Sequence, residues 1–252
     1  MDATADERHR EDGAAMCGRF TMSAETDELI TEFIARGGKL EDWRPSYNVA
    51  PTEAAPIVRE RVRDGETLRE IDAASWGLKP AWAKSGGPAP INARLEGVAS
   101  NGMFRNAFAA RRCIVPMNGY YEWVATAEGK QPYFIHGPET LMAAAGLYEL
   151  TKTAEGSWAL SFTVITREAA DASGEVHDRM PVFLTPDTWD TWVTPQKADS
   201  TGAKDELVAM LDRSSLAVAA TISTYPVSKR VNNVRDTSVA KDDPTLIEPI
   251  AV

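Results

Sequence analysis

The sequence LMAAAGLYELTKTAEGSWALSFTVIT, residues 141–166, contains two apolar runs separated by a short polar segment. The runs, residues 141–148 and 158–166, have the length and the apolar content of buried strands, and Gly156 lies in the loop between them. A shorter apolar run at residues 133–135 precedes them along the chain. Together these runs predict the core of a β-rich domain.

Further strands and helices are expected on both sides of this core. Residues 57–63 and 67–72 alternate apolar and polar side chains around Asp64-Gly65, which predicts a β-hairpin. Ser23 is expected to cap a helix whose apolar positions recur at helical spacing, with the glycines at 37 and 38 ending it. More helices are expected at residues 101–111, at residues 203–211 and starting at Thr185.

Composition narrows the functional classes. The chain has 252 residues, 43% of them hydrophobic, so it can bury a substantial core, and we expect one domain. Two cysteines are too few for a disulfide scaffold, and no apolar run approaches the ~20 residues that cross a bilayer. A reducing, cytoplasmic location without membrane contact is therefore expected. The formal net charge of −10 argues against indiscriminate nucleic-acid binding, although arginines on one face could still hold phosphates.

Neither end of the chain is expected to belong to the domain. Residues 1–15, MDATADERHREDGAA, contain no apolar signal-peptide region and no helical periodicity. We interpret them as a disordered leader that is either a propeptide removed before Cys17 or a mispredicted start, and we favour initiation at Met16. The domain is expected to span residues 16–240, with residues 241–252 as a C-terminal tail.

Met16-Cys17 places a thiol beside a residue that could become the N-terminus. If Met16 is trimmed, Cys17 carries an α-amine of pKa about 7.7–8.0 and a thiol of pKa about 8.5, so a fraction of each is nucleophilic at neutral pH. An aldehyde condenses with such an amine to an imine, and the thiol then closes on the same carbon to form a thiazolidine. The alternative is a buried structural cysteine, which is the commoner use of a single cysteine.

Two other side chains are candidates for proton transfer. Glu122 lies among aromatic residues in GYYEW (119–123), where desolvation raises the pKa of a carboxyl group. An exposed glutamate on a surface strand is the competing interpretation. His177 stands with Asp178 and Arg179 beside the apolar run 182–184, and a histidine titrates near neutral pH.

Several segments suit contact with nucleic acid. Ser46 and Asn48 lie between two prolines that keep the chain extended, and both side chains are expected to point outward. Trp82 could stack on a base, although most tryptophans are core anchors. Asn92 and Arg94 alternate in an extended segment and so face one side, which is also the pattern of a solvated strand. No P-loop, dinucleotide fingerprint or metal-ligand spacing is present, so no cofactor or metal is expected.

Seven short motifs occur in the order found in the SRAP family, whose name stands for SOS response-associated peptidase. They are CGRF (17–20), YNVAP (47–51), WGL (76–78), NAR (92–94), GYYEW (119–123), HDRMP (177–181) and VNN (231–233). The chain resembles that family over nearly its whole length. The resemblance implies a single α+β domain, for which we expect a mixed β-sheet with a barrel-like core and flanking helices. It also implies a monomeric protein that binds single-stranded DNA and forms a covalent thiazolidine with the ring-opened aldehyde of an abasic site, which shields the lesion.

The resemblance also implies roles for individual residues. The catalytic group that it implies is Cys17 as the crosslinking residue, Asn92 as a hydrogen-bonding group at the adduct, and Glu122 and His177 as acid and base. The phosphate ligands that it implies are Arg19 and Arg94, with Arg179 as a further candidate, and Ser46, Asn48 and Trp82 complete the DNA contacts that we expect. A peptidase activity that exposes Cys17 and a lyase-type activity are further implications.

Two other functional classes remain open at this point. An amidotransferase or other N-terminal-nucleophile hydrolase would also use an N-terminal cysteine, but it would act on an amide without any need for DNA. A binding-only protein would hold single strands reversibly and with strong salt dependence.

Overall fold

The apolar runs at 141–148 and 158–166 form adjacent antiparallel strands, β10 (Met142–Lys152) and β11 (Trp158–Glu168). They belong to a computed structural model that describes residues 18–33, 35, 38–40, 43–83, 87–153, 156–236 and 238–251. The predicted hairpin is also present, because β4 (Ala54–Arg63) pairs with β5 (Glu66–Trp76). Asp64 and Gly65 turn the chain with φ of 53° and 84°, the conformation that a two-residue hairpin turn requires. Both predictions are confirmed.

Five strands close into a barrel. Their order is β11, β10, β7 (Arg112–Met117), β4 and β5, and β5 returns to β11 through a parallel pairing of Ser75 with Ser161. Short strands extend it: β2 (Gly38–Lys39) on β5, β6 (Asn92–Arg94) and β12 (Arg179–Pro181) on β11, and β13 (Phe183–Leu184) on β10. The expected mixed sheet with a barrel-like core is therefore confirmed.

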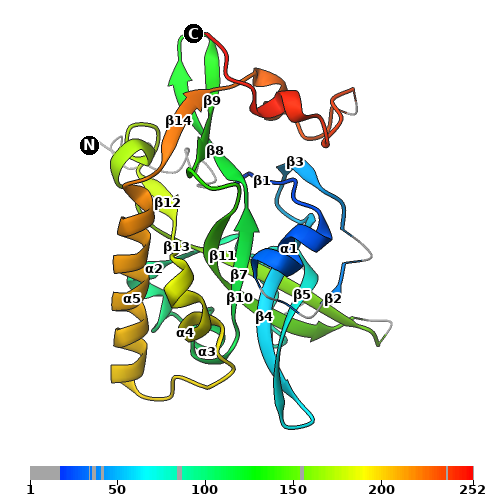
Figure 1. Cartoon of the computed structure of the whole chain (residues 1–252), viewed down its shortest axis with the longest axis vertical. Helices are drawn as coiled ribbons and strands as arrows, with labels where there is room; N and C mark the ends of the chain where they lie inside the picture. The colour runs from blue at the N-terminus through cyan, green and yellow to red at the C-terminus, as the bar shows by residue number, and fades with distance from the viewer. Residues whose placement is uncertain are drawn as a thin grey trace, which may run out of the picture.

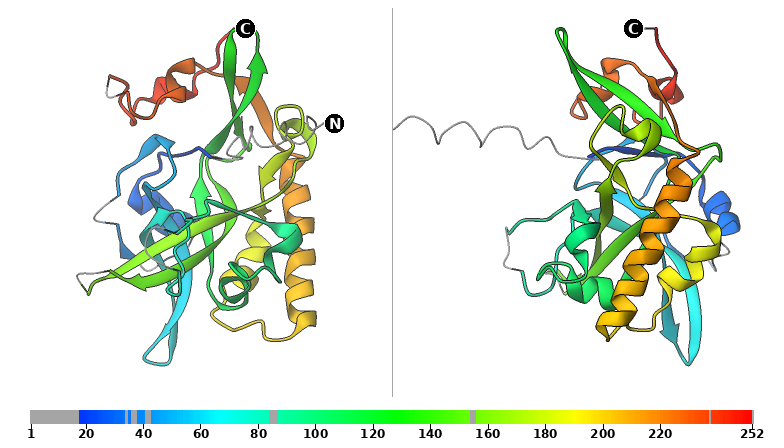
Figure 2. Two further views of the ribbon diagram at one scale, coloured as in Figure 1. Left: turned by 180° about the vertical axis from the view of Figure 1, so that it is seen from behind. Right: turned by 90° about the vertical axis from the view of Figure 1, so that its left-hand side faces the viewer.

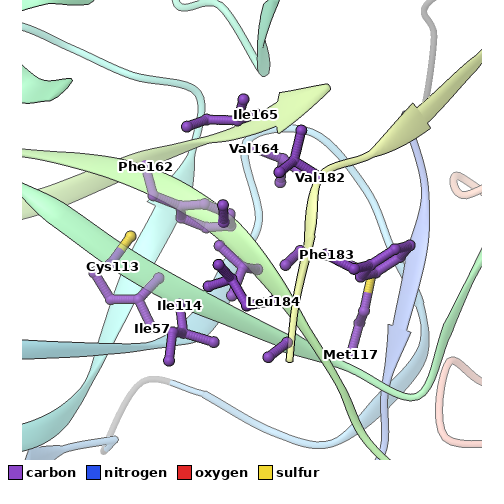
Figure 3. Packing of buried hydrophobic residues seen from close by; sticks show 14 of the residues in the cluster. Ile57, Cys113, Ile114, Met117, Phe162, Val164, Ile165, Val182, Phe183 and Leu184 are labelled. Atoms are coloured by element: carbon purple, nitrogen blue, oxygen red, sulfur yellow. The ribbon is translucent and has the colours of Figure 1, made fainter. Parts of the chain in front are cut away.

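The main hydrophobic core fills this barrel. Alternate side chains of each strand point inward, so Ile57, Cys113 and Phe162 share the inner face of the barrel although they are far apart in sequence (Figure 3). Trp76 stacks on Phe162 with ring centroids 6.2 Å apart and anchors the point at which β5 rejoins β11. Burial of these large rings contributes about 1.5–3 kcal/mol for each side chain.

A second sheet stands on the barrel, with the order β14 (Ser223–Pro226), β9 (Gly129–His136), β8 (Gly119–Thr126), β1 (Phe20–Met22) and β3 (Ser46–Val49). The chain passes from β7 to β8 through Asn118 alone, so the two sheets are joined rigidly (Figure 1). Gly119 begins β8 because a Cβ there would lie 2.3 Å from the Phe134 ring. This junction positions the functional residues described below.

Helices cover the barrel, and α5 runs along it beside β13 in all views (Figures 1 and 2). The α-helices are α1 (Thr26–Glu32), α2 (Leu95–Val98), α3 (Arg105–Ala110), α4 (Trp189–Val193) and α5 (Thr201–Ala219). The 3-10 turns are η1 (Asp171–Ser173), η2 (Pro186–Thr188), η3 (Lys229–Asn232) and η4 (Pro244–Ile247). Within the part of the chain that the structure describes, no helix has the length and apolarity needed to span a membrane.

The predicted helix cap at Ser23 is wrong. Helix α1 starts after Glu25, whose N–H donates to Glu28 Oε2 at 2.8 Å. The backbone N–H of Ser23 instead donates to Asn118 Oδ1 at 2.7 Å, which ties β1 to the β7–β8 junction. Ser23, which the local sequence predicts as a helix cap, instead forms a hydrogen bond to a residue that is distant in sequence. The predicted helix at 203–211 is longer, and part of the apolar run after it forms the last turn of α5.

The segment after residue 240 packs on the second sheet. Leu246 is fully buried in a small cluster with Tyr121, Phe134 and Val227. The Ile250 N–H donates to Pro226 O at 3.0 Å, and this end of the chain lies beside β14 and β9 in Figure 1.

Candidate functional site

A cleft of about 350 Å³ opens on the second sheet near the barrel. Its wall combines segments from distant parts of the chain: Gly18, Arg19, Pro51, Glu122, Trp123, Lys130, His177 and Asn232. The antiparallel pairing of Phe20 with Tyr120 explains one of these meetings, because the same register continued by two residues sets Gly18 opposite Glu122. The structure therefore brings the start of the described chain to both predicted acid–base residues.

Glu122 is a buried carboxylate, with 2% of its surface exposed. It lies on β8, paired with Tyr133 of β9, and its sequence neighbours Tyr121 and Trp123 project from the other face of the strand. The competing interpretation, an exposed surface glutamate, is therefore wrong. A carboxylate kept from bulk water at the wall of a cleft is suited to proton transfer.

His177 reaches the cleft from the turn that connects η1 to β12. Its side chain is 18% exposed, and Nδ1 lies 3.0 Å from Asp178 Oδ1 and 3.1 Å from the Arg179 N–H. Neutral Nδ1 accepts the Arg179 N–H, whereas a protonated imidazolium donates to Asp178 instead. The ring thus has a partner for Nδ1 in each protonation state, which suits a group that takes up and releases a proton.

Arg19 presents a partly buried guanidinium to the cleft. Nη1 donates to Asn48 Oδ1 at 2.8 Å and to Val231 O at 2.7 Å, and the guanidinium lies 5.5 Å from the centre of the Trp123 ring. Desolvation lowers the pKa of Arg19 from its ordinary value, which the negative charge of Glu53 partly offsets. The side chain remains a fixed cation at any pH of interest.

Ser46 and Asn48 do not point outward as predicted, because both are buried on β3. Ser46 Oγ accepts the Asn48 N–H at 3.0 Å, and the Asn48 amide group contacts both Arg19 and Val231 O. The reason is that β3 pairs with β1, so its polar side chains face the Arg19 segment. These two residues orient Arg19.

The remaining predicted DNA contacts lie outside the residues that line the cleft. Trp82 is 61% exposed and Arg94 is exposed, so both can meet a ligand. Asn92 and Arg94 are on β6, as the extended pattern predicted. Arg179 is largely buried, and its guanidinium makes two hydrogen bonds of 2.6 and 3.0 Å to Glu96. That ion pair ties the segment after Arg94 to the segment after His177.

Five cleft residues were not among the predicted site residues: Gly18, Pro51, Trp123, Lys130 and Asn232. The indole N–H of Trp123 donates to Asn232 Oδ1 at 2.8 Å, and the Asn232 amide donates to Lys130 O at 3.2 Å. Trp123 and Asn232 belong to quoted motifs, so a role for them could have been found there. Lys130 follows a turn glycine on an exposed hairpin, and nothing in its local sequence separates it from other surface lysines.

Cys17 and the residues before it lie outside the described residues. Within the described ranges, His, Cys, Asp and Glu side chains nowhere form a group of three or more that could hold a metal ion.

Comparisons with known proteins show the family and the fold of this chain. A sequence model of the family described as SOS response associated peptidase (SRAP) matches residues 16–234. The abasic site processing protein YoqW of Bacillus subtilis (strain 168) is 35% identical, over 92% of this chain and 99% of that protein. The abasic site processing protein YedK of Escherichia coli (strain K12) is 31% identical, over 93% of this chain and 100% of that protein. A solved structure from Bacteroides thetaiotaomicron, 22% identical, aligns with a TM-score of 0.73 over 93% of this chain and 100% of that chain, which shows the fold.

Proposed function

The chain belongs to the SOS response associated peptidase family, and from this premise we propose that it processes abasic sites in single-stranded DNA through a covalent thiazolidine at Cys17. Relatives named abasic site processing proteins support DNA with an abasic site as the substrate. The observation that carries the proposal is the cleft. Gly18, one peptide bond from Cys17, shares its wall with the buried carboxylate of Glu122 and with His177.

The proposed reaction takes place at the aldehyde carbon of the ring-opened sugar. The α-amine of Cys17 adds to this carbon, and the resulting carbinolamine loses water to give an imine. The thiolate then adds to the imine carbon while the nitrogen takes up a proton, which closes the five-membered ring. Sugar-ring opening and loss of water both need proton transfers, and positioned side chains typically accelerate such steps by about 10²–10⁴-fold.

Glu122 and His177 supply these proton transfers in the proposal. Both line the cleft, and they differ in environment: Glu122 is almost completely buried, whereas His177 is partly exposed and has a partner for Nδ1 in each protonation state. Asn92, on β6, is proposed as a hydrogen-bonding group for the adduct. The peptidase activity of the family description corresponds here to exposure of Cys17 by removal of the residues before it.

Phosphate binding is assigned to cations at and near the cleft. Arg19 and Lys130 line it, and Arg94 is exposed on β6, so these three are proposed to hold the DNA backbone, with Trp82 available for base stacking. Asn48 and Ser46 act by orienting Arg19, and Arg179 acts through its ion pair with Glu96. The protein is proposed to work as a monomer in the cytoplasm.

The decisive experiment tests whether the free α-amine of Cys17 is required. A peptide nitrogen is not nucleophilic, so residues 1–16 must be absent from the reactive species. Three proteins are mixed with an abasic single-stranded oligonucleotide and run on a denaturing gel: one with residues 1–16 intact by mass spectrometry, one that begins at Cys17, and the Cys17→Ser form of the latter. Only the second is expected to give a stable adduct, because a hydroxyl closes the ring far less readily than a thiol.

A stable adduct from the protein with residues 1–16 intact would overturn the amine mechanism. Reversible binding without any adduct would indicate a binding-only protein. Release of ammonia from glutamine by the Cys17-first protein, in the absence of DNA, would favour an amidotransferase.

A further inference from the structure

Ser173 contacts both elements that carry the proposed acid and base. Its hydroxyl lies 2.8 Å from the hydroxyl of Tyr120 on β8, and both side chains are 1% exposed. Its carbonyl oxygen accepts the His177 N–H at 3.0 Å and the Val176 N–H at 3.1 Å. Ser173 therefore contacts β8 through its side chain and the backbone of His177 through its carbonyl oxygen.

Tyr120 and Glu122 are two positions apart on β8, so their side chains project from the same face of the strand. A contact that holds the His177 turn against Tyr120 consequently holds it on the face where Glu122 lies. Both Glu122 and His177 line the cleft, in agreement with this placement.

The surroundings of the Tyr120–Ser173 contact limit other arrangements. The Tyr120 ring packs against Phe183 with centroids 6.0 Å apart, so the phenol cannot swing away without disturbing the core. The turn is closed at its other end by the Ala169 N–H, which donates to Asp178 O at 2.9 Å. Asp171 begins η1 with φ of 52°, a left-handed conformation that aspartate adopts more readily than most residues with a side chain.

We propose that Tyr120 and Ser173 are positioning residues that fix the distance between His177 and Glu122 in the crosslinking site. The inference rests on the proposed function. Neither hydroxyl needs to touch the DNA, because both act through His177. Loss of this hydrogen bond would remove neither the acid nor the base, but it would allow the turn that carries His177 to move. Misplacement of a reacting group by about 1 Å can cost on the order of 10²-fold in rate.

The test uses Ser173→Ala and Tyr120→Phe in protein that begins at Cys17, each of which removes one hydroxyl and leaves the rest of the side chain. Single-turnover crosslinking to an abasic oligonucleotide is expected to slow by about 10–10²-fold, while affinity for the same oligonucleotide changes less than about twofold. Tyr121→Phe is the matched control. It removes a buried hydroxyl that donates to Tyr47 O at 2.8 Å, from the opposite face of the same strand. Melting temperatures of all variants verify that each is folded.

A double-mutant cycle with His177→Ala separates positioning from general destabilisation. If Ser173 acts through His177, Ser173→Ala adds no further loss of rate once His177 is alanine, whereas Tyr121→Phe has the same effect in both backgrounds. Additive losses for both Ser173→Ala and Tyr120→Phe would overturn the inference and leave the proposed function intact. A parent protein that forms no adduct, or a His177→Ala variant with an unchanged rate, would overturn the role of His177 and the inference with it.

Discussion

At the scale of single residues, the direction of a buried polar side chain separates a group that faces the cleft from one that holds a neighbour. Glu122 is 2% exposed yet lines the cleft, so its carboxylate meets a ligand without bulk water around it. Asn48 is nearly as buried, but its amide group is already engaged with Arg19 and Val231. A buried polar side chain thus faces the cleft or orients a neighbour according to the direction in which it points.

Glu122→Gln and His177→Ala are each expected to slow single-turnover crosslinking by about 10²–10⁴-fold, because each removes a proton-transfer group. Oligonucleotide affinity should fall far less, since neither side chain is a cation that binds phosphate. Glu128→Gln is the control, because it neutralises an exposed carboxylate on the same hairpin outside the cleft. Unchanged crosslinking rates in both cleft variants would remove these residues from the mechanism.

At the scale of elements, an ion pair clamps α2 to β12. Arg179 is largely buried and makes two hydrogen bonds to Glu96, and its Nη2 also donates to Thr166 O at 2.9 Å. The segments joined in this way carry Arg94 and His177, so the clamp helps to define how the β6 residues stand relative to the cleft. Arg179 is better explained by this contact than by phosphate binding.

The Glu96–Arg179 pair should make stability depend on pH in the acid range. The hydrogen bond from Arg179 lowers the pKa of Glu96 below its ordinary value, so the unfolded chain binds a proton more readily than the folded one. Its stabilisation is present above the ordinary glutamate pKa of about 4.3 and is lost as the pH falls toward the lowered value. Glu96→Gln is therefore expected to lower the melting temperature at pH 7. Between pH 5 and pH 3 the melting temperature of the variant is expected to fall less than that of the parent. Parallel melting curves against pH for parent and variant would contradict this.

At the scale of the whole molecule, an acidic protein carries a local basic site. The net charge is −10, yet Arg19 and Lys130 stand together in the cleft although 111 positions separate them. The second sheet makes this possible, because β1 and β9 flank β8 on either side. A polyanion is attracted by such a local field even where the total charge is unfavourable.

Arg94→Ala is expected to weaken binding of single-stranded DNA and to reduce the slope of log K against log salt by about 0.7, the value for one lost phosphate contact. Arg63→Ala is the matched control, since it removes the same charge from the exposed tip of the β4–β5 hairpin. Equal salt slopes for the two variants would show that the DNA does not contact β6.

The local sequence predicted the secondary structure correctly where the residues of one short segment determine its conformation. The runs that form β10 and β11 are apolar over the length of a strand, and Asp64-Gly65 favours the turn that the hairpin requires. The order of the motifs was enough to identify the family. The Met16-Cys17 pair suggested the type of chemistry that we propose. Glu122 and His177, which belong to two of those motifs, line one cleft.

Tertiary structure alone decided which polar residues face the cleft and which are used to build it. Ser23 forms a hydrogen bond to Asn118 instead of capping a helix. Asn48 forms one to Val231, which is 183 positions away in the sequence, and Arg179 forms one to Glu96. Lys130 lines the cleft because the β8–β9 hairpin packs beside η3, where Asn232 donates a hydrogen bond to Lys130 O. A buried polar group must find a hydrogen-bond partner, and that partner is set by sheet pairing between distant segments, which no local pattern records.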